Sequence, residues 1–350
     1  MVEVAGGAYS GQSISQSSKT SAVTIRPASG ATVTISGDLN ISASHLHVQD
    51  IGSSGSGESR SGLAICNSEC NPGLQDVVVQ NFHGKYAFIR ASNVSVIGGD
   101  FGSFDACAAG NPEDAFRLWG GSIVAQPVNV VVDGVTIHDV ASGSQNTCQG
   151  TSHAGYHVDC MQNQGGQNIT IRNSTFYNCP TSGIQMEPFS GATIGNVTIE
   201  NNFFGPTACC NSIVLGTTTS GANCSSLVIR YNVLYNTPNP DQCASGANGV
   251  QVYGNVFPVS VSCSNGAFDH NVFAASGGST CGTAAKRCAP AWVSTPPTNP
   301  GGGMPNAHVL TSDSCVRGAG DPARYPATDI DGEARPQGAA APDAGPDEVG

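Results

Sequence analysis

The stretch NITIRNSTF, residues 168–176, decides the fold because the chain repeats its pattern. Each copy has an Asn, an apolar β-former, a small residue, another apolar residue, and an Asn, Gly or Asp before an aromatic or aliphatic side chain. The other copies are NVSVIGGDF from Asn93, NVVVDGVTI from Asn129, NVTIENNFF from Asn196 and, more loosely, SLVIRYNVLY from Ser226. The five starts are separated by 36, 39, 28 and 30 residues. Repeats at such spacing indicate a solenoid, whose units bury their apolar faces only by stacking. Because the units are short strands, we expect a parallel β-helix.

The composition agrees with an all-β, turn-rich chain. Among 350 residues there are 45 Gly, while charged residues make up 11% and aromatic residues 6%. Gly serves tight corners at which φ is positive. We therefore predict one solenoid with an N-terminal cap over residues 1–290, followed by a Pro/Gly-rich irregular segment over 291–350 that packs on the solenoid or trails it. The long segments 102–113 and 141–156 are expected to be loops that shape a binding face.

Charge and cysteine content narrow the class of protein. The formal net charge of −12 argues against a nucleic-acid partner, and no apolar run is long enough to span a bilayer. Fourteen Cys, an even number, indicate disulfides and an oxidising compartment. We expect a secreted monomer. Strand-like residues follow Met1 at once, so we expect that the natural leader has been removed.

The Cys positions favour disulfides over zinc. Cys148, Cys160, Cys179 and either Cys209 or Cys210 fall in successive units of the repeat, where they could join coil to coil. The close pairs Cys66 with Cys70 and Cys209 with Cys210 suggest zinc ligands, but no matching second pair accompanies them. The pairing itself stays open.

Asn side chains recur at one position of the repeat. Of six Asn-x-Ser/Thr triplets, those at Asn93, Asn168 and Asn196 open the repeated phrase. We expect these Asn to stack into a ladder at a coil corner, hydrogen-bonded from one coil to the next, rather than to carry glycans.

On the NVSV, NVVV, NITI and NVTI strands with their Asn/Gly corners, residues 20–275 resemble the right-handed parallel β-helix proteins of the pectate-lyase-like superfamily. That superfamily includes polysaccharide lyases, inverting glycoside hydrolases, uronate epimerases, esterases, adhesins and phage tailspikes, so the resemblance implies a fold without settling a function. The segment DIDGEARP, residues 329–336, is similar to the end of many secreted bacterial β-helix proteins.

Coils can be aligned by their Gly pairs. EDAFRLWGG at 113–121 matches VDCMQNQGG at 158–166, and TSGIQMEP at 181–188 and NSIVLG at 211–216 follow. Coils stack at about 4.8 Å and side chains alternate in and out. The alignment predicts inward columns of Phe116, Met161, Ile184 and Ile213 and of Leu118, Asn163 and Met186. It predicts outward columns of Arg117, Gln162 and Gln185 and of Trp119, Gln164 and Glu187.

The outward face is expected to act on a polysaccharide. Asp114 and Asp159 should stack and either share a proton or bind Ca²⁺; no other cofactor is expected. Arg117 can pair with a uronate carboxylate, and Trp119 can stack on a sugar ring. We assign catalytic roles to Asp159, His157, Asp114, Arg117 and Glu187, and substrate binding to Trp119, Gln162, Gln164, Gln185, Lys85 and Arg90.

Each of these residues also has a structural interpretation. Asp114 and Asp159 can cap turns, His157 can be a loop residue, Trp119 can pack at an edge, and Arg117 and Glu187 can simply face solvent. Three functions therefore remain open. The first is a lyase that cleaves an acidic polysaccharide by β-elimination, with His157 or Arg117 as the base. The second is an inverting glycoside hydrolase, whose carboxyl groups stand roughly 6.5–9.5 Å apart. The third is a non-catalytic glycan-binding or adhesin solenoid.

Overall fold

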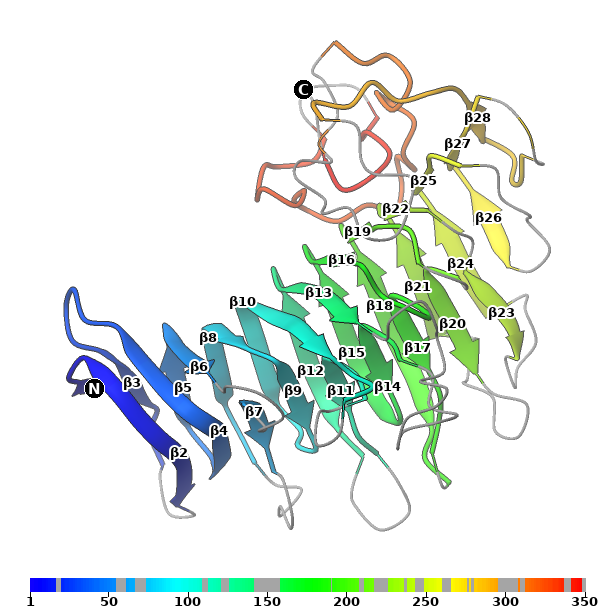
Figure 1. Ribbon diagram of the computed structural model, residues 1–350. Coiled ribbons are helices and arrows are strands. Elements are labelled where there is room, and N and C mark those ends of the chain that lie inside the picture. Colours follow the sequence, from blue (N-terminus) through cyan, green and yellow to red (C-terminus); the bar gives the residue numbers. More distant parts are fainter. Residues whose placement is uncertain are drawn as a thin grey trace.

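The computed structural model of the chain describes residues 1–16, 20–54, 61–66, 74–108, 113–120, 126–141, 158–189, 191–207, 211–216, 226–235, 238–242, 249–259, 266–275, 277, 280–294, 308, 312–336 and 341–347. These residues form 28 strands joined in a single sheet, and every strand pairing within it is parallel, as in the pairs β12–β15 and β15–β18. The strands succeed one another from β2 at one end to β28 near the other (Figure 1). The predicted parallel β-helix is confirmed. No described segment forms a helix with the length and hydropathy needed to cross a bilayer.

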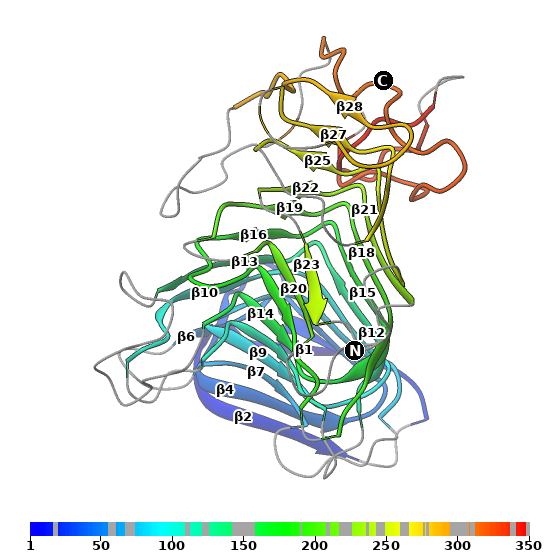
Figure 2. The ribbon, with the colours of Figure 1, turned by 90° about the vertical axis from the view of Figure 1, so that its right-hand side faces the viewer.

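The coils contribute strands to three columns, which Figure 2 shows on different sides of the solenoid. Column A contains β1 (Val2–Val4), β3 (Val23–Pro27), β5 (Leu46–Gln49), the first parts of β8 (Val77–Gly84) and β10 (Val94–Asp105), β12 (Val128–Asp133), β15 (Gly166–Arg172), β18 (Ile194–Glu200), β21 (Leu227–Arg230), β24 (Val250–Tyr253) and β26 (Ala267–Asp269).

Column B follows column A after a corner. It contains the first parts of β2 (Gly7–Gln16) and β4 (Val33–Ala43), β6 (Ile51–Ser54), the second parts of β8 and β10, β13 (Thr136–Ala141), β16 (Thr175–Tyr177), β19 (Phe203–Phe204), β22 (Val233–Leu234), β25 (Val256–Phe257), β27 (Val272–Phe273) and β28 (Lys286–Arg287).

Column C closes each coil and carries the predicted site. It contains the second parts of β2 and β4, β7 (Gly62–Ile65), β9 (Tyr86–Ile89), β11 (Phe116–Leu118), β14 (Met161–Asn163), β17 (Ile184–Met186), β20 (Ile213–Gly216) and β23 (Asn239–Gln242).

The core is a continuous stack of inward side chains. Phe101 packs edge-on against Phe116 with ring centroids 5.4 Å apart, and Phe176 stacks on Phe204 at 4.7 Å. Because side chains alternate along a strand, every second residue enters this stack and the others face outward. One buried cluster runs from Val33 to Phe273, so burial of apolar area continues from coil to coil.

The predicted Asn ladder is confirmed at the corner that leads into column A. The Nδ2 of Asn129 donates to Oδ1 of Asn93 at 2.9 Å, Asn168 donates to Asn129 at 3.0 Å, and Asn196 donates to Asn168. All four residues have positive φ, between 51° and 59°. Asn tolerates this left-handed conformation better than most residues, so one residue type both turns the chain and ties the coils together.

A second ladder is buried at the corner between columns A and B. Asn202, Asn232, Asn255 and Asn271 are all 0% exposed. The backbone N–H of Asn202 donates to Oδ1 of Asn232 at 2.9 Å, and the same 2.9 Å bond joins Asn232 to Asn255 and Asn255 to Asn271. The amide group of Asn232 also donates to the carbonyl of Ile199. Buried backbone groups at this corner are therefore satisfied by side chains of the neighbouring coils.

The C-terminal segment packs on column B of the last coils. Val316 and Ala344 join Val233 and Val256 in a second apolar cluster, and a disulfide links Cys288 to Cys315. Figure 1 shows this segment, drawn in orange and red, beside β22 and β25. The buried Arg335 donates to the carbonyl oxygens of Asp343 and Gly345. The division of the chain at residue 290 stays a prediction.

The buried ladder should matter more for stability than the exposed one. We expect Asn232→Ala to lower the free energy of unfolding by at least about 2 kcal/mol, because it removes the side-chain acceptor of the buried Asn202 N–H and the amide donor to the Ile199 carbonyl. The control Asn129→Gly keeps an unstrained positive φ at the exposed ladder and should cost less than about 1 kcal/mol. Denaturant unfolding measures both. Equal losses in the two variants would contradict this account of the corner.

Candidate functional site

The register of column C agrees with the alignment made from the sequence. Phe116 pairs with Met161, Met161 with Ile184, and Ile184 with Ile213. Arg117, Gln162 and Gln185 form the predicted outward row, which continues to Val214. On the other side the row extends to Phe88 of β9.

A second outward row runs beside the first. The N–H of Gln164 donates to the Leu118 carbonyl and that of Glu187 to the Asn163 carbonyl, both at 2.8 Å. This continues the parallel ladder past the strand ends, so Trp119, Gln164 and Glu187 stand in line as predicted. The N–H of Trp119 donates to the Ile89 carbonyl at 2.9 Å, which brings Arg90 into the same row.

Asp114 and Asp159 lie in successive coils, and each carboxylate accepts a backbone N–H of the next coil. Asp114 is 3% exposed and Asp159 is 0% exposed. Oδ1 of Asp114 accepts the backbone N–H of Asp159 at 2.9 Å. Oδ1 of Asp159 in turn accepts the backbone N–H of Ser182 at 3.0 Å and also its hydroxyl. Each carboxylate therefore caps the start of the strand in the next coil, as in the structural interpretation of these residues.

These contacts do not fit the Ca²⁺ site expected at Asp114 and Asp159. Calcium is bound by six to eight oxygen ligands. Oδ2 of Asp114 already accepts hydrogen bonds from Nε and Nη2 of Arg117, at 3.1 and 2.6 Å. Asp159 is buried among donors from Ser182. A guanidinium cation and backbone N–H groups thus occupy the positions that a metal would need, so these two carboxylates as placed do not fit calcium.

Arg117 is held between two carboxylates. Nη2 of Arg117 lies 2.8 Å from Oε2 of Glu113 and 2.6 Å from Oδ2 of Asp114. Burial acts to lower the pKa of Arg117, but the charges of Asp114 and Glu113 outweigh it and raise the pKa. A guanidinium held in its charged form is a poor proton acceptor, so this geometry argues against Arg117 as the base, and its catalytic role stays a prediction. Arg117 instead positions the strand, and its charge is balanced by the two carboxylates.

Arg90 lies in an aromatic setting beside Arg117. Its Cζ lies 4.6 Å from the ring centroid of Phe88 and 4.7 Å from that of Trp119. Cζ of Arg117 is 5.7 Å from the same Trp119 ring. Burial, and then repulsion from Arg117, lower the pKa of Arg90. Cation–π contacts stabilise the guanidinium, and an anion bound here would stabilise its charge further.

Three aromatic side chains lie together on this part of the face. Trp119 meets Phe88 edge-on at 5.5 Å and Phe189 at 5.7 Å. Phe189 is 49% exposed, which is unusual for so large an apolar side chain. Apolar rings beside polar groups are what a sugar ring packs against.

Amides and one carboxylate form the other part of the face. Oε2 of Glu187 accepts from Nε2 of Gln185 at 2.8 Å and from Nε2 of Gln162 at 3.3 Å. Gln162 and Gln164 are 2% and 9% exposed, yet their Oε1 atoms have no hydrogen-bond partner. A buried acceptor without a donor is costly, so these two oxygens are candidates for ligand contacts.

The structure says less about the remaining predicted site residues, Lys85 and His157. Lys85 lies at the corner before β9, where its N–H donates to the Ser61 carbonyl. His157, predicted as a base, lies outside the described residues, as does most of the predicted loop 141–156. Sequence reasoning missed Glu113, Phe88 and Phe189. Phe88 had a usable signal, since it alternates with the inward residues Ala87 and Ile89 in KYAFIR.

Cysteines support the face from behind. Cys160, which lies between Asp159 and Met161, forms a disulfide with Cys179. This bond joins two successive coils, as the sequence suggested. Cys66 is also disulfide-bonded, which excludes it as a zinc ligand. Cys70, Cys209 and Cys210 lie outside the described residues.

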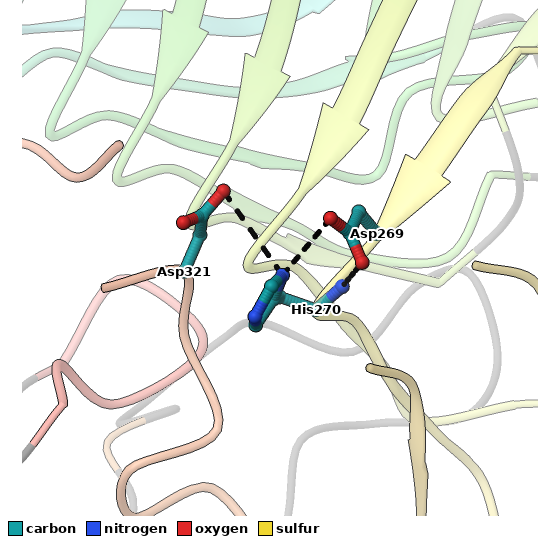
Figure 3. Close-up of side chains that lie close together, drawn as sticks. All are labelled: Asp269, His270 and Asp321. Atoms are coloured by element: carbon teal, nitrogen blue, oxygen red, sulfur yellow. Dashed lines mark hydrogen bonds and ion pairs between the residues drawn. The ribbon is translucent and has the colours of Figure 1, made fainter. Parts of the chain in front are cut away.

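Figure 3 shows the His/Asp cluster Asp269, His270 and Asp321, in which a strand of column A meets the C-terminal segment. Nδ1 of His270 lies 3.1 Å from Oδ2 of Asp269 and 4.0 Å from Oδ2 of Asp321. The guanidinium of Arg324 already pairs with both carboxylates. Its Nε lies 2.6 Å from Oδ2 of Asp321, and its Nη2 lies 3.5 Å from Oδ2 of Asp269. The cluster is therefore an ion-pair network that docks the C-terminal segment, and its cation is a guanidinium.

Known proteins resemble this chain only weakly. No protein-family model matches the chain, and no curated protein matches it. The structure of the Dettilon tailspike protein matches with a TM-score of 0.43 and 12% identity, over 81% of this chain and 62% of that chain. A mutant of the PL6 family alginate lyase AlyGC matches with a TM-score of 0.34 and 12% identity, over 83% of this chain and 50% of that chain. This chain thus spans less than two thirds of either protein.

The capping role of Asp159 can be separated from a catalytic one at the same position. We expect Asp159→Ala to destabilise the fold by about 1–3 kcal/mol, because the buried N–H of Ser182 loses its acceptor. Asp159→Asn keeps an amide oxygen for that N–H and should retain most of the stability. Thermal unfolding of the two variants checks this. If Asp159→Ala unfolds like the unchanged protein, the cap is not what the carboxylate provides.

Proposed function

We propose that the outward face of column C, from β9 to β17, binds an acidic polysaccharide outside the cell, and that the protein cleaves it as a lyase. The observation that carries the proposal is the Arg90 guanidinium held over Phe88 and Trp119 beside Arg117. Cations next to half-buried aromatic rings suit a sugar that bears a carboxylate. Disulfides, of which Cys160–Cys179 is one, support an oxidising compartment.

The residues of the face take distinct roles in this proposal. Arg90 pairs with the uronate carboxylate and, by neutralising it, makes the proton on C5 more acidic. Trp119 and Phe189 pack against the sugar ring. Arg117 stays paired with Glu113 and Asp114 and keeps the strand in place.

The reaction is a β-elimination. A base removes the C5 proton, the electrons of that bond form the C4=C5 double bond, and the C4–O4 bond breaks with O4 leaving as the new chain end after it takes a proton. Because Arg117 is unsuited to remove the proton, the base in this proposal is His157, two residues before Asp159 in the sequence.

Two variants test whether the face is the site. We expect Arg90→Ala and Trp119→Ala to lower the cleavage rate of an acidic polysaccharide at least about tenfold, as loss of a central contact does at other interfaces. The matched control is Arg172→Ala, which removes an exposed Arg of column A that pairs with Asp133. It should leave the rate unchanged.

The assay follows the ultraviolet absorbance of the unsaturated product together with new reducing ends, over acidic and neutral polymers. Both signals, lost in Arg90→Ala and kept in Arg172→Ala, are the expected result. Reducing ends without absorbance would assign a glycoside hydrolase instead. Binding without either signal would leave a non-catalytic glycan-binding solenoid, and no binding at all would overturn the proposal.

A further inference from the structure

The column C face is chemically divided along the axis of the solenoid. At β9 and β11 the outward groups are Arg90, whose guanidinium attracts anions, the rings of Phe88 and Trp119, and Arg117, which is paired with Glu113 and Asp114. At β14 and β17 the outward groups are amides and the Glu187 carboxylate. Neighbouring strands are about 4.8 Å apart, so a glycan chain that follows the axis meets both parts with successive residues.

Glu187 fixes the orientation of the Gln162 amide. Its Oε2 atom accepts from Nε2 of Gln162 at 3.3 Å, and it accepts from Gln185 at 2.8 Å. If the Gln162 amide were flipped, its oxygen would face the carboxylate, which is repulsive. The amide nitrogen must therefore face Glu187, and the oxygen must face away from it.

The amide oxygens of Gln162 and Gln164 have no donor in the described structure. Gln162 is 2% exposed and Gln164 is 9% exposed, and Oε1 of each lacks a donor. The chain gains nothing in stability from such groups, because a desolvated acceptor without a partner costs free energy. Their placement is explained if a ligand supplies the missing hydroxyl or amide N–H donors.

The same part of the face disfavours an anion. A carboxylate brought beside Glu187 would meet a like charge and two amide oxygens, and it has no hydrogen to donate. A neutral sugar, whose hydroxyl groups donate, satisfies Gln162 and Gln164 without repulsion.

We propose that the site takes a heteropolysaccharide, with an acidic residue at Arg90 and a neutral, hydroxyl-bearing residue at Gln162 and Gln164. This rests on the proposed function and sets its substrate class. A homopolymer of uronates would place a carboxylate against Glu187, so it is bound less well.

The test measures by calorimetry how tightly different polymers bind to the wild-type protein and to the variant Gln164→Leu. Hyaluronan, chondroitin and gellan contain uronate together with neutral residues, whereas every residue of alginate is a uronate. The wild-type protein should bind at least one of the mixed polymers about tenfold or more tightly than alginate. Gln164→Leu should reduce that preference, and its melting temperature should be unchanged or higher because an unsatisfied buried acceptor is removed.

A matched control and the contrary outcomes complete the test. Gln167→Leu changes a Gln of the same coil in column A, whose Nε2 donates to Thr193, and should leave the preference unchanged. Alginate bound as well as the mixed polymers would overturn the inference, as would a Gln164→Leu variant that melts earlier or binds like wild type. If alginate binds and Trp119→Ala abolishes that binding, only this inference fails. If the wild type binds none of these polymers, the proposed function fails with it.

Discussion

Registration of each coil on the next is the constraint on which the rest of the structure depends. Parallel backbone hydrogen bonds set the spacing, but they do not by themselves select which residues are paired. The Asn ladders at two corners do, because each Asn must find its neighbour one coil away. The ladder from Asn93 to Asn196 faces solvent, and the ladder from Asn202 to Asn271 is fully enclosed. A slip of one residue would break the bonds of both ladders and would turn the core side chains outward.

The candidate site follows from this registration. Arg90, Trp119, Gln164 and Glu187 come from four separate coils and stand in a row only because the coils are in register. Asp114 and Asp159 stabilise the same coils, because each carboxylate accepts a backbone N–H at the start of the strand in the next coil. Because these carboxylates already accept hydrogen bonds from the next coil, the proposed chemistry falls to other groups of the face. In the proposed function, stability and recognition therefore use different residues of the same strands, which would explain why the fold itself leaves the acceptors of Gln162 and Gln164 unsatisfied.

Sequence reasoning succeeds here where a local pattern fixes a distant contact. The repeat gives the fold, the Gly pairs give the register of Arg117 on Gln162, and the Asn phrase gives the exposed ladder. It is ambiguous where two local patterns look alike. An Asp before a strand reads the same whether its carboxylate is free or caps the N–H of the next coil, so the sequence alone does not separate a catalytic role of Asp114 and Asp159 from a capping one. The charge of Arg117 could not be judged either, because Glu113 and Asp114 neutralise it only in the folded geometry. The docking of Arg335 over Tyr231 joins segments 104 residues apart that share no pattern.

The most direct test of the account is a crystal structure of the protein with an oligosaccharide that alternates uronate and neutral sugars. The account predicts a sugar chain over β9, β11, β14 and β17, with its carboxylate at Arg90 and hydroxyl groups within hydrogen-bond distance of Oε1 of Gln162 and Gln164. A ligand on column A or column B, or a carboxylate seated at Glu187, would contradict it.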